Sequence, residues 1–355
     1  MSSTISMTST ATSTSTATPS CISVTPDKNG YVPEWACNAN YNYYPSFAAA
    51  LIFAVIFGIT TFVHFYQAFA YKKFRLCWVL LVGALWEFAS FAIRSAGTKN
   101  QQSTPLAFVS QILVLLAPMW INAFCYMVMG RMIYFFVPSQ KIFGIKGIKI
   151  AKIFVWLDVL SFLTQLGGGV MISPGSSAST LMTGIHLYMG GIGFQEFCIL
   201  LFTLIAVKFF IDTRLRERTT AGNQILDGRP TNWRTLLYVM FAVLALITMR
   251  IIFRLVEYAG GIDAGKNKLP YHEVYFLVLD AAPMFIALVL FNIVHPGMVL
   301  KGEGSEFPKG LSRKEKREAK RVRKEEKRAA KEAKKALKRE EKEGKAGSSL
   351  MEEIV

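Results

Sequence analysis

Residues 47–70 read FAAALIFAVIFGITTFVHFYQAFA, an apolar stretch without a single Asp, Glu, Lys or Arg. An α-helix needs about 20 such residues to cross the hydrocarbon core of a bilayer. Six further stretches of similar character follow, so spans are predicted at Phe47–Ala70, Leu76–Ile93, Leu106–Phe136, Ile150–Met171, Leu181–Val207, Thr235–Tyr258 and Tyr271–Val294. The expected fold is an all-α integral membrane bundle of seven transmembrane helices. The third stretch is overlong and contains Pro118, which predicts one kinked or tilted helix rather than two spans.

Charge is separated from this apolar part. The 355 residues are 52% hydrophobic, yet the formal net charge is +16. Residues 309–345 supply +10 of that charge, with 18 Lys or Arg against 8 Glu. We therefore expect three regions: a disordered Ser/Thr-rich extracellular N-terminus (1–45), a transmembrane domain (46–296) and a basic cytosolic tail (297–355).

Orientation is predicted from the short loops, because cytoplasmic loops carry the excess of Lys and Arg. Three alternate loops are rich in these residues: Lys72, Lys73 and Arg75; Lys141, Lys146 and Lys149; and Lys208, Arg214, Arg216, Arg218, Arg229 and Arg234. The other loops are poorer. With an odd number of spans, the N-terminus is expected outside and the tail inside.

The first 25 residues are mostly Ser, Thr and Ala, a composition that cannot bury enough apolar surface to become ordered. No basic and apolar leader precedes Phe47, so we expect the first span to act as its own insertion signal. Cys21 and Cys37 lie on the predicted outer side. They either form a disulfide or remain free thiols.

Six acids and four arginines lie inside or at the ends of the predicted spans, and a charge at the bilayer centre costs about 2.5 to 3.5 kcal/mol. They are Glu87, Arg94, Arg131, Asp158, Glu196, Arg250, Arg254, Glu257, Glu273 and Asp280. Many polar residues recur at intervals of seven, nearly two helical turns, so the members of a pair share one helix face. The pairs are Glu87 with Arg94, Asp158 with Gln165, Arg250 with Glu257, and Glu273 with Asp280. Lipid offers no polar partner, so these stripes are expected to turn inward.

Most of these residues fall in the predicted outer half of the membrane, which indicates an outward-facing polar cavity. If each of the four arginines pairs with an acid, two of the six acids remain for protons, water or a cationic ligand. We expect Asp280 and Glu87 to face that ligand, and Arg254 and Glu257 to pair and hold the cavity's shape. The same groups could instead pair only to fix helix packing, and Arg94 and Glu273 could reach the interface.

These polar residues belong to motifs spread over all seven spans. The motifs are Glu87-x6-Arg94, Ala117-Pro118, Tyr126-x3-Gly130-Arg131, Asp158-x6-Gln165-x-Gly167-Gly168, Gly190-x4-Gln195, Arg250-x3-Arg254-x2-Glu257 and Glu273-x6-Asp280. Together they resemble the fungal lipid-translocating exporter family, which includes the resistance-to-aminocholesterol proteins, the molasses-resistance proteins and the sphingoid long-chain-base exporter. The similarity runs from Tyr43 to Pro296.

The resemblance implies a plasma-membrane protein that moves, or protects against, amphipathic lipids and toxic hydrophobic compounds. The candidate substrate-binding or translocation residues are Glu87, Arg94, Asp158, Gln165, Gln195, Arg250, Arg254, Glu257, Glu273 and Asp280. Expected partners are membrane lipids or amphiphilic small molecules, with anionic inner-leaflet lipids at the basic tail. The tail could instead be a charged helix without a partner.

Other chemistries find little support in the residues. Gly260, Gly265 and Lys266 have the spacing of a phosphate-binding loop, but Asn267 stands where that loop needs Ser or Thr, and no strand precedes it. Four histidines are too few and too scattered for a membrane zinc hydrolase, and the last span lacks a retinal-binding lysine. We predict no enzyme activity, no cofactor, no nucleotide site and no nucleic-acid partner. Transport would then be either passive flipping of the substrate or movement driven by a proton gradient.

A seven-helix lipid-sensing receptor is the alternative function, because it would share the topology, the outer cavity and the basic inner surface. The third span contains Met129-Gly130-Arg131-Met132 in place of Asp-Arg-Tyr, and the last span has no Asn-Pro-x-x-Tyr. These differences count against the commonest receptor class alone. We therefore predict a seven-helix membrane transporter of amphipathic lipids or toxic hydrophobic compounds, with the lipid-sensing receptor as the alternative.

Overall fold

The computed structural model describes residues 22–33, 36, 38–172, 177–218, 233–260, 267–300 and 307, and in the tail residues 317, 318, 320–322, 324–326 and 328–333. The chain forms two compact units, residues 1–305 and 306–355. Cys21 and Cys37 lie outside the described residues, so their pairing stays a prediction.

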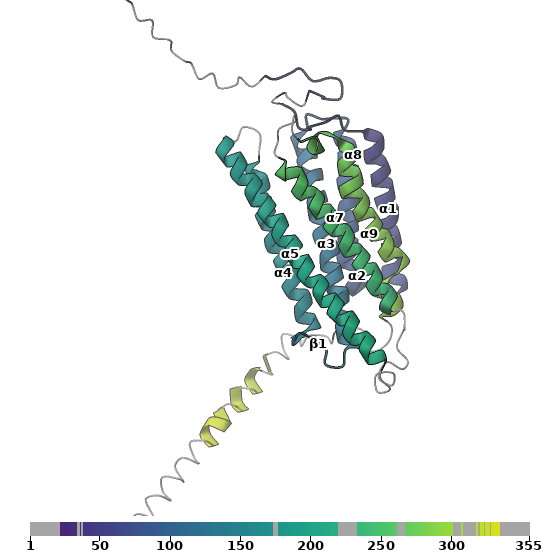
Figure 1. The fold of residues 1–355 in the computed structure, drawn as a ribbon, viewed down its shortest axis with the longest axis vertical. Helices are drawn as coiled ribbons and strands as arrows, with labels where there is room; N and C mark the ends of the chain where they lie inside the picture. The colour runs from purple at the N-terminus through teal and green to yellow at the C-terminus, as the bar shows by residue number, and fades with distance from the viewer. Residues whose placement is uncertain are drawn as a thin grey trace, which may run out of the picture. The chain divides into compact units, whose positions relative to one another are not determined.

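Among the described residues, seven helices are long and apolar enough to cross a membrane, which confirms the predicted number of spans (Figure 1). Six of them are α1 (Phe47–Ala70), α2 (Phe74–Gly97), α3 (Thr104–Phe136), α4 (Gly147–Met171), α5 (Ala178–Glu217) and α7 (Trp233–Ala259). The seventh span covers Glu273–Val299. Predicted and observed ends differ by a few residues, except that α5 continues ten residues past Val207.

Local sequence accounts for several helix ends and interruptions. Ser46 precedes α1, and its hydroxyl accepts a hydrogen bond from the backbone N–H of Ala49 at 3.3 Å, as an N-cap residue does. Ser177 caps α5 in the same way through the N–H of Thr180. Pro118 lies inside α3, which continues through it as one helix. The expectation of one long helix rather than two spans is therefore confirmed.

The seventh span is not one regular α-helix. After the 3-10 turn η1 (Leu269–Tyr271) it consists of α8 (Glu273–Phe276), the π-helical turn η2 (Leu277–Ala281), α9 (Ala282–Ile293) and the short α10 (Pro296–Val299). Pro283 follows the π turn and has no N–H to donate, so the regular ladder of α-helical hydrogen bonds is broken there. The N–H of Ala282 bonds instead to the carbonyl of Leu277, five residues earlier. Asp280 lies within this turn.

The spans pack mainly against their neighbours in the chain. α1 contacts α2, α2 contacts α3, and the series continues through α4, α5 and α7 to α9, which closes the bundle against α1. α3 also contacts α5 and α7, and it is the most buried of the spans. In Figure 1 the α4–α5 pair lies at one edge of the bundle and α1 at the other. The polar stripes of α2, α7 and the seventh span thus meet beside α3.

One end of the bundle carries a short hairpin and the other the N-terminal segment (Figure 1). The hairpin joins α3 to α4 and consists of β1 (Lys141–Ile142) and antiparallel β2 (Ile145–Lys146). Its turn contains Gly144 at φ +75°, a backbone conformation that suits glycine. We call the two ends the hairpin end and the N-terminal end.

The described part of the N-terminal segment has defined structure. Gln102 Nε2 donates to the carbonyl of Gly30 at 2.8 Å, and the N–H of Gln101 donates to the carbonyl of Asn29 at 2.9 Å. Asn40 Nδ2 in turn donates to the carbonyl of Gln101 at 3.0 Å. The predicted disorder of residues 1–45 therefore does not extend to residues 22–33 and 38–45. Residues 1–21 lie outside the described residues.

In the second unit, the described residues between 317 and 333 are helical and exposed. They are mostly Lys, Arg, Glu and Ala, residues with high helix propensity. These described residues therefore form an exposed, charged helical stretch.

Candidate functional site

The main group of charged residues in the bundle lies where α2, α7 and η2 meet. We call Glu87, Arg250, Arg254, Glu257 and Asp280 the ion-pair cluster. Arg250 and Arg254 both form salt bridges with the Asp280 carboxylate, one to each oxygen. Arg254 Nη1 also reaches Glu257 Oε2 at 2.8 Å, one turn away on α7. Polar groups of three helices are thereby joined inside an apolar bundle.

The cluster is shielded from water. The relative exposure is 1% for Glu87 and Asp280, 4% for Arg254 and 5% for Arg250. The guanidinium of Arg250 gains one further partner, because its Nη2 donates to the carbonyl of Val114 on α3 at 3.2 Å. The expectation that the polar stripes turn inward is confirmed for these residues.

The structure corrects one expected pairing. Arg254 and Glu257 do pair, as their spacing on α7 indicates, but Asp280 was expected to lack an arginine partner and has two. The π turn supplies the reason, because it turns Asp280 toward α7. Glu87 lies beside Arg250, Arg254 and Asp280. It has no arginine or lysine within ion-pair distance among the described residues.

A second polar group covers the cluster at the N-terminal end of the bundle. We call Tyr43, Ser46, Arg94, Glu273 and Phe276 the cap group. Arg94 Nη2 lies 3.4 Å from Glu273 Oε1 and also donates to the hydroxyl of Tyr43. Glu273 Oε2 accepts a hydrogen bond from the N–H of Ser46 at 2.7 Å. The start of α1 is therefore tied to α2 and α8.

Phe276 connects the cap group to the ion-pair cluster. The guanidinium carbon of Arg94 lies 4.6 Å from the centre of its ring, and that of Arg254 lies 5.5 Å from it. Cations at this distance are attracted to the face of an aromatic ring. The two arginines therefore share one aromatic partner, and a displacement of Phe276 would disturb both groups.

Tyrosines just before α1 complete the cap. Burial raises the pKa of Tyr43 above its ordinary value, although the positive charge of Arg94 acts in the opposite direction. Burial likewise raises the pKa of Tyr41, whose ring centre lies 5.9 Å from the guanidinium carbon of Arg94. Both phenols are therefore neutral near pH 7. Tyr43 and Ser46 therefore join the segment before α1 to Arg94 and Glu273.

A third polar group lies among α3, α4 and α5. We call Asn122, Tyr126 and Asp158 the Asp158 group; their side chains face one another and are at most 1% exposed. Neither carboxylate oxygen of Asp158 has a hydrogen-bond partner of good geometry, and the same holds for the Tyr126 hydroxyl and the Asn122 amide. The rings of Phe154 and Phe202 lie against Tyr126 at centroid distances of 5.4 and 4.5 Å. The Asp158 carboxyl thus faces a phenol and an amide, with no cation beside it among the described residues.

Gln165 and Gln195 form a separate polar contact between α4 and α5. Gln165 Nε2 donates to Gln195 Oε1 at 2.9 Å. Two glycines allow the helices to approach so closely: a Cβ atom on Gly191 would lie 2.8 Å from Gln165 Cγ, and one on Gly168 would lie 2.5 Å from the backbone N of Tyr188. A side chain at either position would prevent this close approach of α4 and α5.

The candidate residues chosen from the sequence omitted several members of these groups, although Tyr126 belongs to one of the motifs. Asn122 and Tyr126 lie on α3, where apolar residues occur on every face and no periodic polar stripe marks the inner side. Thr248 was also missed; its hydroxyl donates to Glu196 Oε1 at 2.9 Å between α7 and α5. The i, i+7 spacing of charges could not identify these neutral groups.

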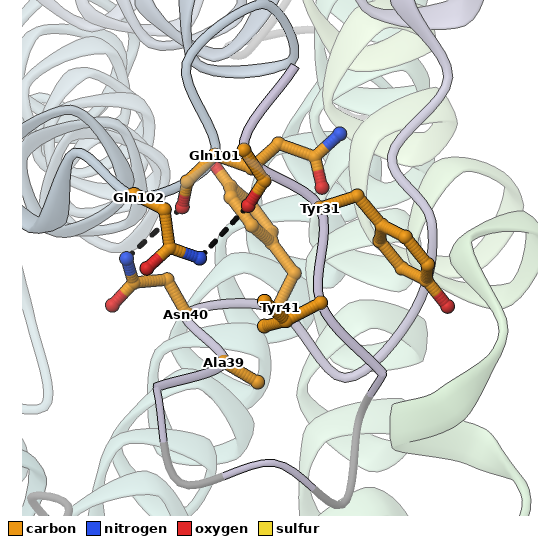
Figure 2. Close-up of a pocket in the computed structure, with 8 residues that line it drawn as sticks. Tyr31, Ala39, Asn40, Tyr41, Gln101 and Gln102 are labelled. Atoms are coloured by element: carbon orange, nitrogen blue, oxygen red, sulfur yellow. Dashed lines mark hydrogen bonds between the residues drawn. The ribbon is translucent and has the colours of Figure 1, made fainter. Parts of the chain in front are cut away.

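A small pocket lies outside the bundle core, between the N-terminal segment and the loop that follows α2 (Figure 2). Figure 2 shows the side chains of Asn40 and Gln102 bonded to backbone carbonyls at its edge. Its volume of about 10 Å³ is close to the space that one water molecule needs. It is therefore too small to be the site of an amphipathic lipid.

Comparisons with known proteins agree with the sequence motifs. A model of the family described as RTA1 like protein matches residues 80–303. A probable lipid transporter, atnI, of Emericella nidulans is 45% identical over 300 residues, covering 84% of this chain and 78% of its own. A lipid-translocating exporter-like protein RTA1 of Leptosphaeria maculans is 27% identical, over 74% of this chain and 52% of its own. A sphingoid long-chain base transporter, RSB1, of Saccharomyces cerevisiae is 23% identical over 78% of both chains. No solved structure matches the chain.

Proposed function

This chain belongs to the RTA1-like protein family, and on that premise we propose that it is a membrane transporter that moves amphipathic lipids or toxic hydrophobic compounds across the bilayer. The observation that carries the proposal is the ion-pair cluster, a set of charged groups buried inside seven apolar spans. Such residues are costly in lipid and mark the paths of substrates and ions through membrane proteins. A relative named as a sphingoid long-chain base transporter supports this choice of substrate class.

The charges of the cluster favour a cationic head group. The cluster holds three carboxylates against two guanidiniums, so one acid is in excess when all are ionised. Arg250 and Arg254 are occupied by Asp280 and Glu257. We assign the contact with the substrate to Glu87, the acid without an arginine or lysine at ion-pair distance among the described residues. A sphingoid base carries an amine that would neutralise it.

The other residues of the earlier candidate set take supporting roles in this proposal. Asp280, with Arg250 and Arg254, holds α7 to the seventh span. Arg94 and Glu273 close the N-terminal end of the cluster. Gln165 and Gln195 join α4 to α5.

A flux measurement with the purified chain tests the function. The protein is reconstituted into vesicles with a fluorescent sphingoid base, and an added quencher reports how fast the base changes leaflet. We expect protein-dependent flux that needs no other protein. A receptor would bind the base without moving it, so binding without flux would favour the lipid-sensing alternative.

The variant Glu87→Gln tests the role of Glu87 in this flux, because it keeps the shape of the side chain and removes its charge. We expect flux of the cationic base to fall to the protein-free level, while the variant stays folded and well expressed. Glu196→Gln is the matched control, since Glu196 contacts Thr248 away from the cluster. Normal flux in a well-folded Glu87→Gln variant would contradict the assignment of Glu87.

The membrane arrangement is part of the proposal. The Lys and Arg of the loops between the first and second, third and fourth, and fifth and sixth spans support an N-terminus on the outside. From the family resemblance we propose the plasma membrane as the location. The cap group would then face the cell exterior. A protease added to intact cells should remove the Ser/Thr-rich N-terminus and spare the tail. The reverse pattern would invert the whole orientation.

For the tail we propose attraction to anionic lipids of the inner leaflet. Residues 309–345 carry 18 Lys or Arg but also 8 Glu. Each basic residue near a charged surface contributes up to about 1 kcal/mol, and the interspersed Glu reduce the total. The full chain and a tail-truncated variant are compared for capture of vesicles with and without anionic lipid. Equal capture of vesicles with and without anionic lipid would exclude this role of the tail. Equal capture by the full chain and the truncated variant would exclude it as well.

A further inference from the structure

We propose that Asp158 is a proton-binding site and that protons exchanged at this carboxylate drive the movement of a cationic amphiphile; the inference rests on the transport function proposed above. The closed bundle would hold Asp158 in its protonated form. The proton would leave when the surrounding helices separate.

The first step of the argument is the surroundings of Asp158. Its side chain is buried at 1% exposure, and neither of its oxygens has a hydrogen-bond partner of good geometry. The titratable groups that face it among the described residues are Tyr126 and Cys125 on α3 and Cys198 on α5. None of these is a cation. An ionised carboxylate without a counter-charge is very costly in such a place, so the acid is neutral there.

The second step is depth. Asp158 is the twelfth of the 25 residues of α4, so it lies near the middle of its span. A proton bound at mid-membrane can be exchanged with either side, according to which end of the bundle opens. Acidic residues in the membrane interior of pumps and transporters serve as such proton relays. Asn122 and Tyr126 would stabilise the carboxylate once the proton has left, because both can donate a hydrogen bond to it.

The third step is the physical link between Asp158 and the ion-pair cluster. Helix α5 contacts both regions: Phe202 lies against Tyr126, and Tyr188 lies against Tyr258 of α7 with ring centroids 4.5 Å apart. Tyr188 also lies close enough to Arg254 for their charges to interact. A movement of α5 would therefore change the surroundings of the proton site and of the substrate site together.

Charge balance gives the direction of exchange. When a cationic head group sits at Glu87, loss of one proton from Asp158 keeps the total charge of the bundle constant. One proton entering and one monovalent cation leaving is therefore an electroneutral exchange that moves no net charge through lipid. Protons would flow from the acidic to the alkaline side, and the amphiphile would accumulate in the leaflet that faces the acidic side.

The test uses the full chain in vesicles with an imposed difference of one pH unit and no membrane potential. The probe is a fluorescent long-chain quaternary ammonium amphiphile, because an ordinary amine would redistribute with pH even without protein. A one-for-one exchange should concentrate the probe up to about ten-fold between leaflets, since one pH unit is a factor of ten in proton activity. A protonophore should abolish the accumulation.

Two variants identify the residue. Asp158→Asn should leave protein-dependent flux measurable and reduce the ten-fold accumulation to none, whereas the matched change Glu196→Gln should keep it. Tyr126→Phe removes a donor to the carboxylate and so favours the protonated acid, and it should move the pH profile of transport to higher pH. It serves as the second variant if Asp158→Asn is not folded.

An infrared spectrum of the resting protein provides a readout independent of transport. The absorption of protonated carboxylic acids should be present, and the component that belongs to Asp158 should be lost in Asp158→Asn. Flux that is independent of the pH gradient would overturn the proton site and leave the transport function intact. An infrared spectrum that is the same in Asp158→Asn would do so as well. Absence of flux with every amphiphile would overturn the transport function, and the infrared result would still decide the state of Asp158.

Discussion

The ion-pair cluster and the Asp158 group place acidic side chains in the same apolar bundle in two different ways. Asp280 is bonded to two arginines from α7, whereas Asp158 faces an amide and a phenol, with no cation beside it in the described part of the chain. The first acid is stabilised as a charge by its partners. The second avoids the cost of burial by being neutral. A buried aspartate is therefore charged in one region and neutral in the other. The same Asp→Asn substitution should reduce stability by different amounts in the two regions.

The largest loss of stability is expected for a change of Arg254, because this one side chain forms ion pairs with two acids. Arg254→Ala removes a partner from Asp280 and the partner of Glu257 at once. Breaking a buried ion pair by removing one member costs about 3 to 5 kcal/mol. We expect a strong loss of folded protein at the cell surface and a lower temperature of inactivation in detergent. Arg234→Ala is the control: Arg234 pairs with Glu217 at an exposed site, where pairs contribute less than about 1 kcal/mol.

The comparison itself is tested by making one substitution in both regions. Asp280→Asn leaves two arginines facing an uncharged side chain, and we expect a loss of about 3 kcal/mol in stability. Asp158→Asn replaces a neutral acid by a neutral group of the same shape and should cost less than about 1.5 kcal/mol. Thermal inactivation of the purified variants measures both. Equal losses would mean that Asp158 is ionised in the resting bundle, contrary to the difference described here.

A smaller loss of stability is expected for a substitution in the cap group. Tyr43→Phe removes the hydroxyl that accepts a hydrogen bond from Arg94 and keeps the ring. Hydrogen bonds to charged groups contribute about 1.5 to 3 kcal/mol. The loss should appear as faster proteolysis of the segment before α1, with the inner helices unaffected. Tyr44→Phe is the matched control, since Tyr44 is exposed. Similar proteolysis of the two variants would show that the Tyr43 hydroxyl does not hold the cap.

The smallest loss of stability is expected when the hydrogen bond between α4 and α5 is removed. Gln165→Leu breaks the hydrogen bond to Gln195, a contact between neutral groups. Such bonds contribute about 0.5 to 1.5 kcal/mol. We expect a modest fall in the inactivation temperature and normal expression. A loss as large as that of Arg254→Ala would place Gln165 among the essential members of a site and would blur the distinction between charged and neutral contacts.

Much of the architecture could be predicted from the sequence, because the bilayer sets a minimum length for each span and forbids unpaired polar groups in lipid. Seven apolar stretches therefore fixed the number of spans. The interval of seven between Glu87 and Arg94, or between Glu273 and Asp280, placed each pair on one buried face of a helix. Arg254 and Glu257, one turn apart on α7, could be paired by the same reasoning.

Partners on different helices could not be predicted, since they depend on how the helices are rotated and shifted against one another. Asp280, which pairs with Arg250 and Arg254, lies in the π turn before Pro283, a local irregularity that periodic patterns do not contain. Asp158 came to face Asn122 and Tyr126 through the packing of α4 on α3, and these neutral residues carry no distinct pattern on a helix that is apolar all round. The sequence by itself determined which faces are polar and turn inward, because that follows from the cost of exposing charge to lipid. The tertiary structure alone decided which acid is paired and which is not, because ion pairs depend on distances of a few ångströms between chain segments far apart in sequence.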